Sequence, residues 1–199
     1  MQDYIITQTV NHYPLHRHIR TAARPRETRN NDIPLFCMDS SLPRNHDGNM
    51  IQQASQEDFP AILSLQFLAF GEVARRLGFA TLPPLEQTLE DLQEEARHGV
   101  FLKYTENDRI IGSVRGCLDT AQVCHVGKLI VAPDCRNRGI GQQLMLALEE
   151  RFREKAAGYL LFTSADTPET LYLYRKLGYT ELGRKEAGGM TTVFLEKKV

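Results

Sequence analysis

The ten residues "CRNRGIGQQL", 135–144, join a predicted strand to a predicted helix. A short apolar run ends before them at Val131, and an amphipathic helical pattern begins at the glycines. The first turn of a helix has free backbone N–H groups and the positive end of the helix dipole, and both favour an anion. The pattern R-x-x-G-x-G over residues 136–141 therefore predicts a turn that binds phosphate.

Two common phosphate-binding loops do not fit this turn. A Walker loop needs Gly-Lys-Ser/Thr after four intervening residues, and the chain lacks it here. A dinucleotide fingerprint needs a third glycine, whereas "GIGQQL" has only two. The turn must serve another phosphate-bearing ligand, or it is simply the start of a helix.

The apolar pattern on either side of this turn predicts a mixed succession of strands and helices. Helical spacing appears in four segments and β-rich runs in seven. The predicted helices cover residues 59–76, 85–99, 139–157 and 168–178, and the predicted strands cover 50–54, 100–105, 109–118, 123–132, 158–165, 179–183 and 191–198.

Polar residues and glycines mark the ends of these elements. Ser55 with Asp58 predicts an N-cap, and Thr167 with Pro168 predicts another at the last helix. Gly99 and Gly178 close the second and fourth helices. "TENDR" and "DTAQ" predict short turns, so three neighbouring strands form an antiparallel meander.

Two motifs give the chain a resemblance to a known family. "VGKLIVAPDCRNRGIGQQLM", 126–145, resembles the acetyl-CoA-binding motif of the GCN5-related N-acetyltransferase (GNAT) superfamily. "LYLYRKLGY", 171–179, resembles the second signature of that superfamily at the expected distance downstream. The resemblance covers roughly residues 50–197. It implies an α/β (α+β) GNAT fold over residues 50–199, with a central mixed, mostly antiparallel sheet of about seven strands flanked by helices.

The resemblance also implies the residues of a cofactor site. The end of the fourth strand resembles the segment whose backbone binds the pantetheine arm of acetyl-CoA, and the glycine turn resembles the pyrophosphate loop. Tyr174 matches a tyrosine that protonates the leaving thiolate in many relatives. The implied cofactor-binding residues are Leu129, Ile130, Val131, Arg136, Asn137, Arg138, Gly139, Ile140 and Gly141.

The activity implied is direct transfer of an acetyl group from acetyl-CoA to an amine, in which backbone N–H groups stabilise the oxyanion. A charged ammonium has no lone pair, so a base or a water chain must remove its proton. Relatives that use an acidic residue near position 129 differ from this chain, which has Leu129 there. The base therefore stays open among His125, which shares a face with Leu129 if no bulge intervenes, and Glu72, Glu86 and Glu90.

Two further residues near the motifs are not assigned a catalytic role. Thr167 stands where many relatives have an asparagine, so we interpret it only as an N-cap. Cys135 lies beside the turn, but direct transfer needs no cysteine nucleophile.

Composition limits the partners of the chain. It has 199 residues, with 24 basic and 25 acidic side chains, so no general binding to nucleic acid or a membrane surface is expected. The four cysteines form no C-x-x-C pair, and the chain opens with no leader pattern, which favours a cytoplasmic location. No apolar run reaches the roughly 20 residues that a membrane span needs.

Residues 1–49 differ in texture from the rest and predict a flexible N-terminal extension. Met50 stands directly before the first strand, so these residues fit a translated upstream extension. We expect no metal site there, because flexible tails rarely preorganise ligands, and docking of a partner on the basic residues stays open. The segment holds His12, His16, His18, Arg17, Arg20, Arg24, Arg26 and Arg29.

Several alternatives remain open at this point. The chain is either an N-acetyltransferase or a CoA-binding sensor or interaction module on the same fold, since fold alone does not fix activity. The acceptor is a small molecule or a protein, and the early helices and the loop between the last two strands are expected to select it. A homodimer is also open.

Overall fold

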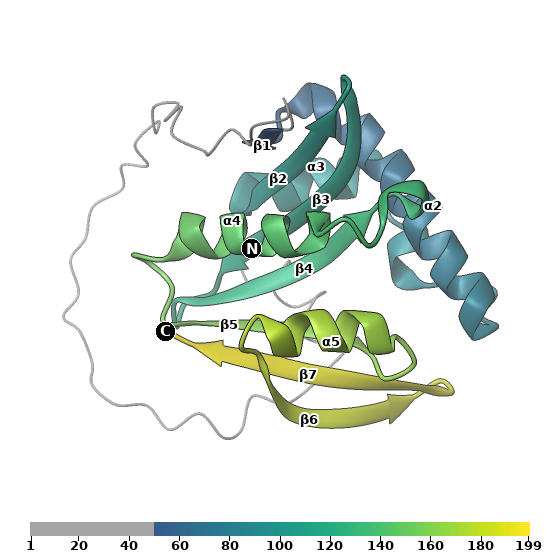
Figure 1. Cartoon of the computed structure of the whole chain (residues 1–199), viewed down its shortest axis with the longest axis vertical. Coiled ribbons are helices and arrows are strands. Elements are labelled where there is room, and N and C mark those ends of the chain that lie inside the picture. The colour runs from purple at the N-terminus through teal and green to yellow at the C-terminus, as the bar shows by residue number, and fades with distance from the viewer. Residues whose placement is uncertain (1–49) are drawn as a thin grey trace. The chain divides into compact units, whose positions relative to one another are not determined.

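The structure is a computed structural model that describes residues 50–199, in which seven strands form one sheet in the order β1-β2-β3-β4-β5-β7-β6 (Figure 1). The pair β4–β5 is parallel and all other pairs are antiparallel, which confirms the predicted mixed, mostly antiparallel sheet. The strands are β1 (Met50–Gln53), β2 (Val100–Glu106), β3 (Arg109–Leu118), β4 (Val123–Val131), β5 (Gly158–Ser164), β6 (Thr180–Ala187) and β7 (Met190–Lys198).

Four α-helices flank the sheet, together with three short 3-10 turns. Figure 1 shows α4 and α5 on the face of the sheet toward the viewer. The helices are α2 (Phe59–Leu77), α3 (Leu89–His98), α4 (Ile140–Phe152) and α5 (Pro168–Lys176), and the turns are η1 (Gln56–Asp58), η2 (Pro83–Leu85) and η3 (Pro133–Cys135).

Alternate residues of the central strand β3 face the two helical layers. A Cβ atom added to Gly116 would lie 3.2 Å from both Leu148 and Phe152 of α4. The neighbouring Arg115 points the other way, where it contacts Gln66 of α2 and Glu95 of α3. Because side chains alternate along a strand, α2 and α3 cover one face of the sheet and α4 covers the other.

Most of the predicted element ends are confirmed. Ser55 and Asp58 form a capping box at the start of η1, which leads directly into α2. Asn107 and Asp108 both have positive φ angles, 49° and 59°, as a tight two-residue hairpin turn requires. The predicted apolar face of α4 is buried along its whole length.

Thr167 is the N-cap residue of α5 and Pro168 its first helical residue, as predicted, but the Thr167 hydroxyl donates to the carbonyl of Ser164 and accepts no hydrogen bond from the first turn. Three predicted element bounds were wrong. The second helix begins at Leu89 rather than at 85, because Pro83 and Pro84 hold a 3-10 turn there and Thr88 is the cap. Strand β6 runs to Ala187 rather than 183, while α4 stops at Phe152 rather than 157. The predictions for residues 1–49 lie outside the described residues.

We predict that Gly116→Val lowers the free energy of unfolding by about 1–3 kcal/mol, because the new side chain overpacks a filled core. Its Cβ would lie 3.0 Å from the Cys124 sulfur, before the two γ-carbons are added. Gly183→Val on β6 is the matched control, since nothing lies within 4 Å of a Cβ there. Urea unfolding of both variants measures the difference, and an equal effect at the two positions would contradict the packing argument.

Candidate cofactor and acceptor site

Strands β4 and β5 pair only at the first three residues of each. Val123, Cys124 and His125 pair with residues 158–160, after which β4 stays with β3 and β5 stays with β7. Figure 1 shows the two strands diverging from their shared end. Beyond His125, therefore, the edge of β4 that faces β5 has no strand partner among the described residues, and its backbone is available to an extended ligand.

The opening between the diverging strands β4 and β5 is called the wedge below. A β-bulge in β4 sets the direction of the side chains that line it. Lys128 has a φ of 49°, and the pairing with β3 jumps there by one residue. The bulge turns Leu129 and Val131 toward α4, where they would lie 3.7 and 3.9 Å from a Cβ atom added to Gly141. Leu173 of α5 would lie 3.4 Å from the same atom. The predicted pantetheine segment thus meets the glycine turn and α5 at one place.

The predicted phosphate turn has the backbone geometry of an anion site. Asn137 and Gly139 have positive φ angles of 61° and 78°, and α4 begins directly after them. The backbone N–H groups of residues 136–142 donate to no backbone carbonyl of residues 50–199. Seven amides at a helix N-terminus are thus free of backbone partners, as binding of a diphosphate requires.

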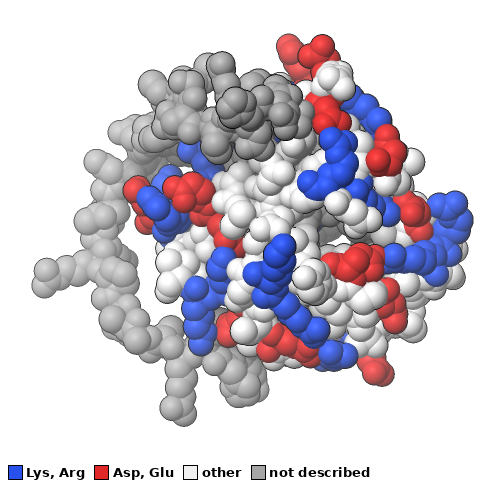
Figure 2. Space-filling model, viewed as in Figure 1, with Lys and Arg blue, Asp and Glu red and all other residues white. Residues whose placement is uncertain are grey.

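The two arginines of the turn contact carboxylates. Arg136 pairs with Glu72 of α2 at 3.0 Å, and the Arg138 guanidinium contacts both carboxylate oxygens of Glu106 on β2. The hydrogen bonds and charge of Glu106 raise the pKa of Arg138, which therefore stays charged. Basic and acidic side chains also lie interspersed over the face shown in Figure 2. Both arginines of the turn are therefore paired with carboxylates and do not form an uncompensated basic patch.

Tyr174 is buried on α5, one residue after Leu173. Its ring packs against Tyr179 with the ring centroids 5.9 Å apart. Burial raises the pKa of the Tyr174 hydroxyl, because the interior disfavours the phenolate. The hydroxyl therefore stays protonated, in the state that a proton donor needs.

The structure places the candidate bases apart from one another. His125 lies opposite Cys117, so it faces away from α4, whereas the bulge turns Leu129 toward α4. Its ring nitrogen contacts Asp119 at 2.9 Å. Glu72 pairs with Arg136, while Glu86 and Glu90 are exposed. The expectation that His125 shares a face with Leu129 therefore fails at the bulge.

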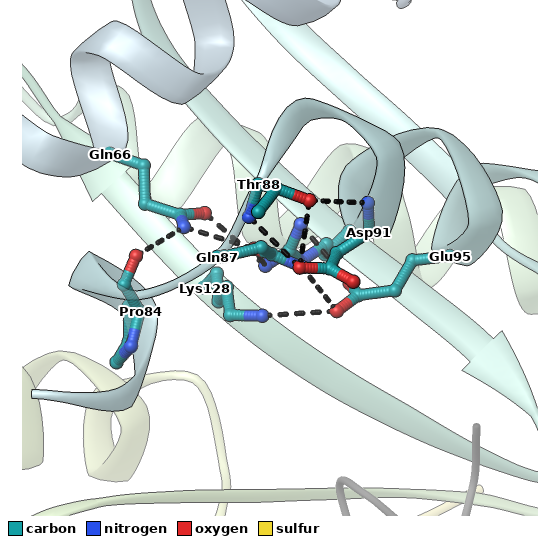
Figure 3. Close-up of polar contacts among 8 residues, drawn as sticks. Gln66, Pro84, Gln87, Thr88, Asp91, Glu95 and Lys128 are labelled. Carbon is teal, nitrogen blue, oxygen red and sulfur yellow. Dashed lines mark hydrogen bonds and ion pairs between the residues drawn. The ribbon is translucent and has the colours of Figure 1, made fainter. Parts of the chain in front are cut away.

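A polar network that the sequence reasoning missed lies under α2 and α3, on the opposite face of β4 from Leu129. One carboxylate oxygen of Glu95 lies 3.1 Å from a guanidinium nitrogen of Arg115, and the other lies 3.2 Å from the Lys128 ammonium (Figure 3). A second guanidinium nitrogen of Arg115 contacts Gln66 and Gln87. Polar residues inside apolar runs, such as Arg115 in "IIGSVRGCL", were the sequence pattern that could have indicated this buried network.

Comparison with known proteins assigns the family. The sequence model of the acetyltransferase (GNAT) family matches residues 55–179, which include the wedge, the glycine turn and Tyr174. The chain belongs to the GNAT family. The GNAT resemblance of the two motifs is thereby confirmed.

Two curated relatives from Bacillus subtilis (strain 168) match this GNAT chain. The UPF0157 protein YqkA is 27% identical over 137 residues, which are 67% of this chain, but the match spans only 38% of that protein's length. S-(2-succino)cysteine N-acetyltransferase is 28% identical over 159 residues, which are 73% of this chain and 93% of that protein.

Solved structures share the fold of this chain. The PaiA N-acetyltransferase from Thermoplasma acidophilum, solved in complex with coenzyme A, has a TM-score of 0.64 and 18% identity, over 76% of this chain and 99% of its own. The ribosomal-protein-S18-alanine N-acetyltransferase from Escherichia coli has a TM-score of 0.63 and 15% identity, over 76% of this chain and 94% of its own. At these identities the likeness shows the GNAT fold alone.

The remaining expectations are resolved only in part. Within residues 50–199, no helix is both long and apolar enough to cross a membrane, and no three metal-binding side chains gather in one place. The cytoplasmic location, the homodimer and a domain boundary at residue 49 stay predictions.

We predict that His125→Gln lowers stability by about 1 kcal/mol and leaves acetyl transfer within about threefold of the parent. The histidine supports the turn before β4, where Asp119 also accepts from the amides of Ala121 and Val123. Thermal unfolding and thiol release at saturating substrate measure the two effects. A hundredfold loss of kcat with unchanged stability would instead make His125 the base.

Proposed function

We propose that this chain transfers the acetyl group of acetyl-CoA directly to the amine of a small acceptor. The observation that carries the proposal is the continuity of the wedge with the glycine turn. The unpaired edge of β4 leads from His125 to Val131, and the amides of residues 136–142 follow directly. A ligand with an amide-bearing arm and a diphosphate matches both parts.

The residues present fit acetyl-CoA, which supplies an activated acetyl thioester when it is bound. Leu129, Ile130 and Val131 would offer backbone hydrogen bonds to its pantetheine arm. Residues 136–141 would hold its diphosphate through their amides, because glycines at 139 and 141 let the ligand approach. A side chain at Gly141 would point toward Leu129 and Leu173 and narrow that space.

The two arginines of the turn would add charge by exchanging partners. Arg136 is 35% and Arg138 46% exposed at the side chain, so both can move from their carboxylates to a phosphate. An arginine binds either anion with two parallel hydrogen bonds. Glu72 and Glu106 thus hold the arginines in place until a phosphate replaces them.

Tyr174 would protonate the thiolate that leaves. Burial keeps its hydroxyl neutral, and α5 brings it next to the contact between Leu173 and the wedge. Donation of a proton by a positioned side chain typically contributes 10²–10⁴-fold to a rate. No covalent enzyme intermediate is needed in this scheme.

We propose a small amino acid as the acceptor. S-(2-succino)cysteine N-acetyltransferase, which acts on a modified amino acid according to its name, matches over nearly its whole length. The ribosomal-protein enzymes among the solved structures match at lower identity and support only the fold.

We predict that Gly139→Glu abolishes binding of acetyl-CoA to the folded chain, because it places a negative side chain where the diphosphate would lie. Gly139→Ala is the matched control, since it has the same strain at a φ of 78° but no charge. Calorimetric titration of acetyl-CoA should show weakened but measurable binding for the alanine variant and no heat of binding for the glutamate variant. Absence of binding to the parent chain would remove the proposed function.

We predict that Tyr174→Phe lowers kcat about a hundredfold or more and leaves the Kd for acetyl-CoA unchanged, because only the proton donor is lost. Tyr172→Phe on the same helix is the control, since its side chain is 69% exposed. Thiol release with S-(2-succino)cysteine and a panel of amino acids measures kcat. Equal rates for the two variants would remove Tyr174 from the chemistry.

A further inference from the structure

Lys128 lies at the mouth of the wedge, on the face opposite the predicted thiolate acid. It stands at the bulge of β4, three residues beyond His125, where pairing with β5 ends. Its ammonium reaches α3 and contacts Glu95, as Figure 3 shows, whereas the next residue, Leu129, points toward α4. The side chain is 26% exposed, so a solute can reach it.

Among the described residues, Lys128 shares the one carboxylate in contact with it with a second cation. Glu95 is shared between Lys128 and Arg115, so one carboxylate faces two cations. Asp91, the other acidic group near Lys128, binds the backbone N–H and hydroxyl of Thr88 at the start of α3. Asp91 acts on Lys128 through its charge but does not contact it, so no carboxylate of residues 50–199 contacts Lys128 alone.

Of the two cations, Lys128 is the more accessible to a ligand. Arg115 is buried: its guanidinium contacts Glu95, Gln66 and Gln87 and lies 5.0 Å over the ring of Phe101. The ammonium of Lys128 has three N–H donors, and Glu95 is its one partner among residues 50–199. Two donors of a charged group thus remain for a ligand.

We propose that Lys128 binds a carboxylate of the acceptor, so that the chain selects amines that also carry a carboxylate. The inference rests on the proposed function, because it names the acceptor chemistry of the same site. A carboxylate matches the two N–H donors of the Lys128 ammonium that Glu95 leaves free. A fully cationic polyamine would meet repulsion from the same group.

The pH dependence of acceptor binding follows from the same contacts. Burial and the nearby Arg115 lower the pKa of Lys128 to about 8, while Glu95 and Asp91 oppose that change. Lys128 is therefore mostly charged at pH 7 and mostly neutral at pH 9. Since an anion binds only the charged form, affinity for a carboxylate falls as pH rises through 8.

We predict that Lys128→Met weakens binding of S-(2-succino)cysteine about ten- to a hundredfold at pH 7, the usual cost of losing a hydrogen bond to a charged group. Lys128→Arg, which stays charged, should bind within about fivefold of the parent. Titration into chain saturated with coenzyme A measures Kd without turnover. Lys155→Met, at an exposed lysine beyond α4, is the control for loss of charge alone.

The pH series separates this role from others. The parent should bind about tenfold more weakly at pH 9 than at pH 7, and Lys128→Arg should lack that change. L-methionine should likewise bind more tightly than 3-(methylthio)propylamine, which lacks the carboxylate.

Three results would overturn the inference. These are no binding of either carboxylate probe, equal binding of methionine and its decarboxylated analogue, and a Lys128→Met effect confined to kcat that grows as pH rises through 8, which would make Lys128 a base. Acetyl-CoA binding by the parent and its loss in Gly139→Glu test the proposed function separately, so the two failures are distinguishable.

Discussion

The site depends on the end of pairing between β4 and β5. Two parallel strands that begin side by side separate after three residue pairs, while β5 stays paired with β7 and β4 stays paired with β3 through the bulge at Lys128. Backbone groups that face such an opening need partners, since unpaired polar groups are costly when water is excluded. An extended ligand with its own amides meets that need, so the same break in the sheet that weakens the fold locally creates the binding edge.

The bulge also divides the chemistry between two faces. It turns Leu129 and Val131 toward α4 and α5, which carry the glycine turn and Tyr174, and leaves Lys128 on the side of α2 and α3. The side of α4 and α5 therefore holds the free amides and the buried Tyr174, and the opposite side presents an ammonium held by a carboxylate. In the proposed transfer, a thioester between the two sides would meet its acid from one side and its amine from the other.

The sequence predicted what depends on short segments and left out what depends on register and on distant contacts. The order of elements and the place of the glycine turn at the start of a helix both follow from contiguous patterns along the chain. The pairs of Arg136 with Glu72 and of Arg138 with Glu106 join segments far apart in the chain, so no local pattern reveals them.

The one-residue jump at Lys128 reversed the expected face of Leu129 relative to His125, because periodicity along a strand fails at a bulge. Gln66 is a polar residue that α2 buries, and its contact with buried Arg115 joins two segments far apart in the chain.

The cost of that network argues for a role beyond packing. Arg115 and Glu95 are charged groups at a sheet surface covered by helices, and burial lowers the pKa of Arg115 to about 10. Replacing such ion pairs with apolar residues of similar size is often neutral or stabilising, so stability alone is weak grounds for keeping them. The pair does fix where Lys128 points, because Glu95 is held by Arg115 on one oxygen and receives Lys128 on the other. Because Arg115 fixes the Glu95 carboxylate, Glu95 in turn orients the Lys128 ammonium, which would otherwise extend into water. An ammonium fixed in this way can select an acceptor both by charge and by position.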